Sequence, residues 1–197
     1  EPNQIDVWRI WLDREEGWMW EVLSAEDQAR AKRFKFPRHR RRNIVARASL
    51  RHLLGQYLNI DPLDITLPTT QHGKPYIQQL YKAHELMFNV THSHECALIA
   101  FTLDRLVGVD IEHHRSVNDV GNIAKHFFAA GEVAKLQTVP EAEKQMTFLK
   151  CWTRKEAFIK AIGEGLSHQL HKFEVTFLPD EQPRLLYDKS DPRAAEN

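Results

Sequence analysis

The chain has 197 residues, 42% of them hydrophobic, which is enough for one large domain or two small ones with a real core. Lys and Arg number 27, as do Asp and Glu, so no global charge attracts nucleic acid or acidic lipid. Only Cys96 and Cys151 are present, too few for a disulfide framework and unsuited to structural zinc, so a reducing, cytoplasmic setting is expected. No apolar run approaches the roughly 18 residues of a membrane helix, so we expect no membrane insertion.

Strand and helix patterns alternate in the N-terminal half. Residues 5–12 mix β-branched and aromatic residues with polar ones at alternate positions and predict a strand. Ser24, with Asp27 three residues later, resembles a capping box for a helix that ends near Phe34. Apolar residues then recur on one face from Pro37 to about residue 58, which predicts a long helix.

Short strands and a turn are expected next. Residues 65–67 predict a strand, and residues 73–75 a turn in which glycine permits a positive φ and proline fixes the exit. The apolar run 96–103 predicts a buried strand, and residues 106–112 predict another.

The C-terminal half continues with helices and ends in a hairpin. The helices are expected at about residues 117–126, 130–137 and 141–162, and the hairpin strands at residues 172–178 and 184–187. The two groups of elements, residues 1–105 and 106–197, predict an α+β fold with two lobes of similar size.

A basic block opens the long helix, and it consists of Arg38, His39, Arg40, Arg41 and Arg42. Such a block is commonly solvated surface, or else a site for an anion or an acidic partner. Basic residues at a helix N-terminus oppose the macrodipole, which mildly favours a functional reason.

Asp110 and Glu112 stand two residues apart on an expected strand, where the pleat directs alternate side chains to the same face. Two like charges side by side are unfavourable unless something neutralises them. Oxygen ligands without a nearby pair of cysteines favour Mg²⁺ over zinc. The plain alternative is a strand end whose acids face water.

The stretch from Trp152 to Lys160 is dense in charge yet has helical spacing. Glu156 and Lys160 lie one turn apart, with Lys155 beside them. Alone, this pattern fits a solvated helix face with salt bridges. His92 stands in a polar patch between Thr91 and the following serine, where a histidine is usually a structural hydrogen-bonding residue.

Together these motifs resemble one family. The segments are FNVTHS (88–93), VGVDIE (107–112), FF..GE (127–132) and WTRKEAFIKAIGEGL (152–166), with GKP (73–75), KRF (32–34) and Arg42. Their order and separations are similar to those of the 4′-phosphopantetheinyl transferases of the surfactin-synthetase-activating (Sfp) type. The resemblance covers about residues 5–178 and is more specific than any single short motif.

The resemblance implies an Mg²⁺-dependent enzyme that moves the phosphopantetheine arm of coenzyme A to a serine of an apo acyl or peptidyl carrier protein. The other product would be 3′,5′-ADP. The family fold is a pseudo-twofold pair of α/β lobes with the active site between them. We expect a cytoplasmic monomer that binds neither nucleic acid nor membrane.

The matching site residues follow from the motifs. Those matching the family's Mg²⁺ ligands are Asp110, Glu112 and Glu156. Those matching its phosphate contacts are His92, Lys155 and Lys160. Those expected beside the adenine are Gly73, Lys74, Pro75 and Thr91, and those near the 3′-phosphate are Arg42 and the region of Lys32.

Glu156 is the candidate proton acceptor, directly or through metal-bound water, and Lys160 supports the phosphate charge. A glutamate pKa near 4.3 makes a weak base at neutral pH, so we expect late proton transfer with positioning dominant. A nucleotide phosphotransferase is disfavoured because no Walker or kinase motif occurs, and a nucleic-acid-binding module is disfavoured by the zero net charge.

Two departures from the family pattern stand out. Thr91 replaces a common serine but keeps the hydroxyl group. The chain ends soon after the hairpin, so we expect the C-terminal lobe to be truncated. The sequence does not identify the carrier protein.

Overall fold

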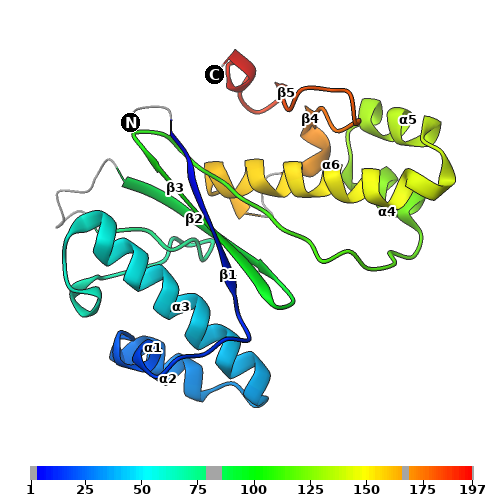
Figure 1. Cartoon of the computed structure of the whole chain (residues 1–197). Coiled ribbons are helices and arrows are strands. Elements are labelled where there is room, and N and C mark those ends of the chain that lie inside the picture. Colours follow the sequence, from blue (N-terminus) through cyan, green and yellow to red (C-terminus); the bar gives the residue numbers. More distant parts are fainter. Residues whose placement is uncertain (1–3, 79–85, 166–168, 197) are drawn as a thin grey trace. The chain divides into compact units, whose positions relative to one another are not determined.

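The computed structural model describes residues 4–78, 86–165 and 169–196. The chain divides into two compact units, Glu1–Ile111 and Glu112–Asn197, which we call unit 1 and unit 2. Figure 1 labels the helices and strands of both units. Within the described ranges, no helix combines the length and apolar character needed to cross a bilayer.

Unit 1 contains an antiparallel three-stranded sheet of order β1-β3-β2. Its strands are β1 (Asp6–Trp11), β2 (Leu86–Ser93) and β3 (Cys96–Leu103). Ile99 in the central strand is opposite Trp8 on one side and Val90 on the other. A two-residue connection joins β2 to β3, and His94 adopts a positive φ of 52° there.

The helices of unit 1 are α1 (Trp18–Glu21), α2 (Ala25–Lys32) and α3 (Pro37–Leu58), followed by the 3-10 helix η1 (Pro62–Asp64). α3 lies against one face of the sheet (Figure 1), where Leu50 and Leu54 pack with Ile99 and Phe101 in one apolar cluster. The Ser24 hydroxyl accepts the backbone N–H of Asp27 at 3.2 Å and caps α2 as predicted.

Unit 2 is mainly helical. Its elements are α4 (Val120–Phe127), α5 (Ala130–Thr138), α6 (Glu141–Ile162), η3 (Leu170–Lys172), β4 (Phe173–Val175), β5 (Leu185–Asp188) and η4 (Ala194–Glu196). The core joins Phe148 and Ile159 of α6 to Phe128 and Phe173. Gly163, with φ of 78°, ends α6, since glycine accepts the left-handed conformation of a helix C-terminus.

The mixed α and β content is confirmed, as are the N-terminal strand, the long helices and the antiparallel C-terminal hairpin. Two predicted strands are wrong. Residues 65–67 are irregular, and the carbonyl of Ile65 accepts a hydrogen bond from the Arg51 side chain instead of a neighbouring strand. Residues 106–112 are also irregular, and the N–H of Val109 donates to the Asn89 side chain at 2.9 Å. The predicted lobes 1–105 and 106–197 stay a prediction.

Candidate functional site

A cavity of about 560 Å³ lies within unit 1. It is bounded by α2, α3, the turn at residues 69–75 and the end of β2. The lining residues are Leu12, Arg30, Phe34, Arg38, His39, Arg42, Asn43, Ala46, Arg47, Leu50, Thr69, Gly73, Pro75, Val90, His92 and His94. Four of the predicted site residues therefore share one cavity: Arg42, Gly73, Pro75 and His92.

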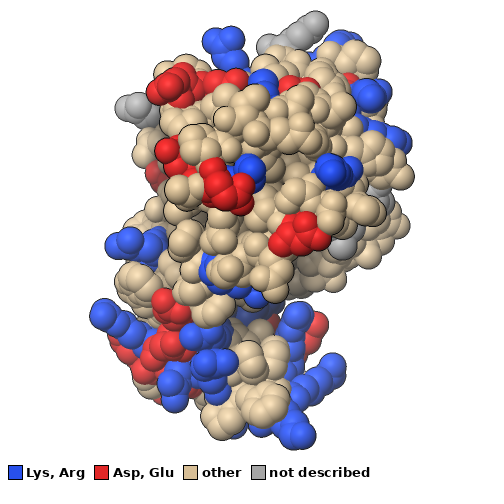
Figure 2. All heavy atoms as spheres, turned by 90° about the vertical axis from the view of Figure 1, so that its right-hand side faces the viewer, with Lys and Arg blue, Asp and Glu red and all other residues tan. Residues whose placement is uncertain are grey.

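The charged side chains that line this cavity are all cationic. They are four arginines, with three histidines among the other lining residues, while none of the described lining residues is Asp or Glu. Figure 2 shows Lys and Arg gathered with interspersed acids at its lower end, where the helices of unit 1 lie. Guanidinium groups match phosphate oxygens in geometry as well as charge. The chain is neutral overall, so this cavity supplies the local attraction for an anion.

Arg42 is held by an acid outside the cavity lining. Its Nε and Nη2 donate to the two carboxylate oxygens of Asp13, both at 2.8 Å. The hydrogen bond from Arg42, together with its charge, holds the pKa of Asp13 below its usual value. A guanidinium has five N–H donors, so this pair leaves others for a ligand.

A buried polar network of Asp27, Arg47 and Arg51 adjoins the cavity. Asp27 is 2% exposed and accepts hydrogen bonds from Arg47 Nε at 2.7 Å and from Arg51 Nε at 2.5 Å. Burial alone would raise the pKa of Asp27, but the two guanidinium groups outweigh it and lower that pKa. Arg51 also donates to the carbonyls of Pro62 and Ile65, both at 2.8 Å. The network fixes the cavity residue Arg47 and the loop after α3.

The predicted turn at residues 73–75 is confirmed. Gly73 has φ of 79°, and its N–H donates to the carbonyl of Thr70 at 2.9 Å. The N–H of Thr70 in turn donates to the carbonyl of Lys74 at 2.9 Å. Lys74 is half-buried, and this burial lowers the pKa of its ammonium group. The turn presents Gly73 and Pro75 to the cavity.

Thr91 and Asp110 are brought together in unit 1. The Thr91 hydroxyl donates to Asp110 Oδ1 at 3.0 Å, and Thr91 is buried on β2. This hydrogen bond orients a carboxylate of the kind that Mg²⁺ prefers as a ligand. Glu112, the first residue of unit 2, and Glu156 supply the same hard oxygen donors. These donor types suit Mg²⁺, but among the described residues no group of three or more acidic, histidine or cysteine side chains is placed to hold a metal ion. The metal site that combines these residues stays a prediction.

The predicted residues of α6 differ in their surroundings. Glu156 and Lys160 are half-buried, whereas Lys155 is fully buried, with its Nζ 2.8 Å from Glu132 Oε1. Burial lowers the pKa of Lys155, and the neighbouring Glu132 carboxylate opposes this shift. The ammonium group thus points into the core of unit 2, where it contacts Glu132 and the backbone. The expected contact of Lys155 with phosphate stays a prediction.

Several residues of these sites carried no prediction. They are Arg30, Asn43, Arg47 and His94 in the cavity, and Glu132 in unit 2. Arg30 and Arg47 continue the basic faces of α2 and α3 at helical spacing. This spacing could have predicted both arginines from the sequence. Glu132 is the last residue of the motif FF..GE (127–132). An acid three residues after the start of a helix normally indicates only the capping of that helix N-terminus.

Comparison with known proteins identifies the family. The profile of the 4′-phosphopantetheinyl transferase superfamily matches residues 106–197, and that of the 4′-phosphopantetheinyl transferase N-terminal region matches residues 9–103. The 4′-phosphopantetheinyl transferase HetI of Nostoc sp. is 37% identical over 186 residues, which cover 93% of this chain and 78% of HetI. The chain belongs to the 4′-phosphopantetheinyl transferase superfamily.

Other transferases of this superfamily align over most of the chain. Sfp of Bacillus subtilis is 30% identical over 183 residues, covering 90% of this chain and 79% of Sfp. The transferase psf-1 of Bacillus pumilus is 32% identical over 163 residues, covering 83% of this chain and 67% of psf-1. The family prediction is confirmed, and transfer of phosphopantetheine from coenzyme A to carrier proteins is the activity of this family.

Proposed function

We propose that the chain transfers the phosphopantetheine arm of coenzyme A to a serine of an apo acyl or peptidyl carrier protein in an Mg²⁺-dependent reaction. The observation that carries the proposal is the cationic cavity of unit 1, which brings Arg42, the turn at residues 73–75 and His92 together. A nucleotide that carries a 3′-phosphate and a pyrophosphate has anionic groups that the arginines of this cavity can bind. Family membership supports the same ligand.

Within the cavity, arginines such as Arg42 and Arg38 bind phosphate oxygens, while Gly73 lets the backbone of the turn approach the nucleotide base. His92 is exposed at the end of β2 and donates to a phosphate oxygen. Thr91 holds Asp110 for the metal. These residues fix the position of coenzyme A before the serine arrives, which is the main requirement of phosphoryl-type transfer.

In the reaction, the serine Oγ bonds to the phosphorus that carries pantetheine, and the bond from that phosphorus to the bridging oxygen breaks. The leaving group is 3′,5′-ADP, and the serine proton passes to Glu156 or to water. Mg²⁺, held by Asp110, Glu112 and Glu156, would neutralise the pyrophosphate charge. Lys160 adds electrostatic support. Since a glutamate pKa near 4.3 gives only a weak base, proton transfer is late.

The exposed basic block of α3 is the proposed docking region for the carrier protein. Arg41 is exposed and lies outside the cavity lining, and Phe36 beside the block is 60% exposed. An acidic carrier would associate faster through such a region, and added salt would weaken this steering.

The two-lobed fold, the oligomeric state and the cellular location complete the proposal. We propose the pseudo-twofold pair of lobes, residues 1–105 and 106–197, with the active site between them. We also propose a monomer that acts in the cytoplasm, a setting supported by the scarcity of cysteine in the sequence.

The test is to incubate the protein with coenzyme A, MgCl₂ and a panel of apo carriers, then to weigh each carrier by mass spectrometry. We expect a mass increase of one phosphopantetheine group that is lost when EDTA replaces MgCl₂. Arg42→Ala should raise the KM for coenzyme A about tenfold, because it removes a charged phosphate contact. Arg41→Ala is the matched control and should leave that KM unchanged. Absence of a mass shift in every carrier would reject the function.

A further inference from the structure

The ammonium group of Lys155 is enclosed in the core of unit 2. Its side chain is 0% exposed, and its Nζ lies 2.7 Å from Glu132 Oε2 and 2.6 Å from the carbonyl oxygen of Phe173. The Phe173 ring centroid lies 4.0 Å from the same nitrogen, a cation–π distance. Hydrogen bonds and the aromatic ring thus take the place of solvent around this cation.

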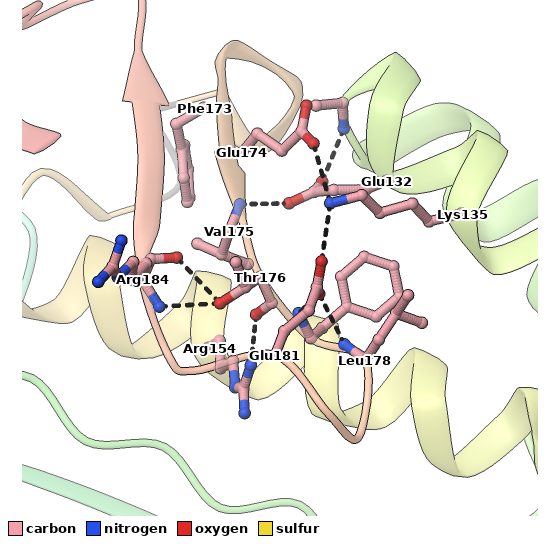
Figure 3. A network of polar contacts seen from close by, with 12 residues as sticks. Glu132, Lys135, Arg154, Phe173, Glu174, Val175, Thr176, Leu178, Glu181 and Arg184 are labelled. Carbon is pink, nitrogen blue, oxygen red and sulfur yellow. Dashed lines mark hydrogen bonds and ion pairs between the residues drawn. The ribbon is translucent and has the colours of Figure 1, made fainter.

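Glu132 joins three elements through one carboxylate. Besides Lys155, it accepts the N–H of Ala129 at the start of α5 at 2.8 Å and the N–H of Val175 on β4 at 2.9 Å. Figure 3 shows the carboxylate directed to Val175. The Glu132 side chain is also 0% exposed. A single buried pair therefore connects α5, α6 and β4.

The residue before Lys155 also binds the hairpin segment. Arg154 Nη1 donates to the carbonyl of Thr176 at 2.5 Å, and Thr176 Oγ1 accepts the N–H of Arg184 at 2.8 Å (Figure 3). Two successive residues of α6 thus bind backbone carbonyls at 173 and 176. These contacts fix both the rotation of α6 about its axis and its position along that axis.

The rotation of α6 decides where Glu156 and Lys160 point. Successive residues of an α-helix are about 100° apart around the axis, so anchoring Lys155 in the core directs Glu156 to a defined flank. A buried ion pair seldom stabilises a fold more than apolar residues of similar size would. The presence of this buried ion pair next to Glu156 therefore favours a role in orienting the Glu156 side chain.

We propose that Glu132 and Lys155 are positioning residues of the transferase, whose buried ion pair sets the place of Glu156 and Lys160. The proposal rests on the proposed function, and it replaces a direct contact between Lys155 and phosphate. Charge removal at either residue leaves the other charge buried without its partner. Removing both charges together avoids that situation and leaves the apolar packing of α6.

The experiment is a double-mutant cycle of Glu132→Gln, Lys155→Met and the two combined. We expect each single variant to lose about 100-fold in kcat, the scale reached when reacting groups are misplaced by about 1 Å. The KM for coenzyme A should rise much less than kcat falls, because the cationic cavity of unit 1 is untouched. The combined variant should regain at least tenfold in kcat over either single variant.

Phe148→Leu is the matched control, since Phe148 is buried on α6 two turns before Lys155. It should lower the melting temperature while keeping kcat near the wild-type value. If this control loses as much kcat as Glu132→Gln at equal folded fraction, the effect is general loosening and the proposal fails. If the combined variant is as inactive as Lys155→Met, Lys155 acts directly on phosphate and the proposal also fails.

A second measurement does not depend on activity. Hydrogen exchange of the α6 amides at residues 156–160 should accelerate in both single variants and return toward wild type in the combined one. Unchanged exchange in the single variants would overturn the positioning role even in an active enzyme. If the wild type modifies no carrier but the exchange pattern appears, the proposed function fails while the structural coupling stands.

Discussion

Replacing Asp27 by Asn tests the buried network behind the cavity. The Asp27 and Arg51 side chains are 3% and 4% exposed, and Arg47 is 20% exposed. Breaking a buried ion pair from one side typically costs 3–5 kcal/mol, because a charge stays buried without its partner. Arg51 keeps its two carbonyl acceptors, so the lower end of that range applies, about 3 kcal/mol.

That loss corresponds to a melting temperature about 6–12 °C lower for a chain of this length. Urea unfolding, followed by circular dichroism and tryptophan fluorescence, measures the free energy of unfolding. Heating followed by circular dichroism measures the melting temperature. The matched control is Asp13→Asn, which also removes a carboxylate bound to arginine through two hydrogen bonds, but from an exposed position. Exposed pairs contribute little, so the control should shift the midpoint much less. Equal midpoints for the two variants would refute the reasoning.

Four further results are expected. The stability gap between wild type and Asp27→Asn should begin to shrink below about pH 4, the pKa of an unfolded aspartate, because a carboxyl whose pKa is lowered on folding loses its contribution as the pH falls on through its folded pKa. Urea midpoints between pH 3 and pH 7 measure this. Ile159→Ala should destabilise the protein by about 2–4 kcal/mol in the same assay, because this side chain is 2% exposed. Gly73→Ala should cost about 1 kcal/mol and weaken coenzyme A binding in calorimetry, since a φ of 79° strains alanine although space for its methyl group is open. Thr91→Val removes the hydrogen bond to Asp110 and should raise the Mg²⁺ concentration for half-maximal activity, with unchanged half-activation as the contrary result.

The sequence predicted the elements whose signals are local. The capping serine of α2, the proline start of α3 and the glycine turn at residue 73 each act within a few residues, and each was found where expected. Arg42 and His92 were located by motif, and the structure brings both into one cavity.

The misses depend on tertiary partners. Residues 106–112 have the alternation of a strand, but the N–H of Val109 is bound by the Asn89 side chain, which stands 20 residues earlier. Lys155 has the spacing of a solvated helix face, and its burial depends on Glu132, 23 residues away. Periodicity within a segment carries no information about such a distant partner, so the buried pair could not be predicted.

The pair between Asp13 and Arg42 has a consequence for ligand selectivity. The two hydrogen bonds from Arg42 to Asp13 restrict the rotamers of the Arg42 side chain in the folded protein, so part of the entropy cost of ordering a flexible cation is already met before a ligand binds. The same carboxylate competes with any anion for the guanidinium group. A single small anion therefore gains little there, whereas a ligand with several phosphates is favoured because it engages other cations of the cavity at the same time.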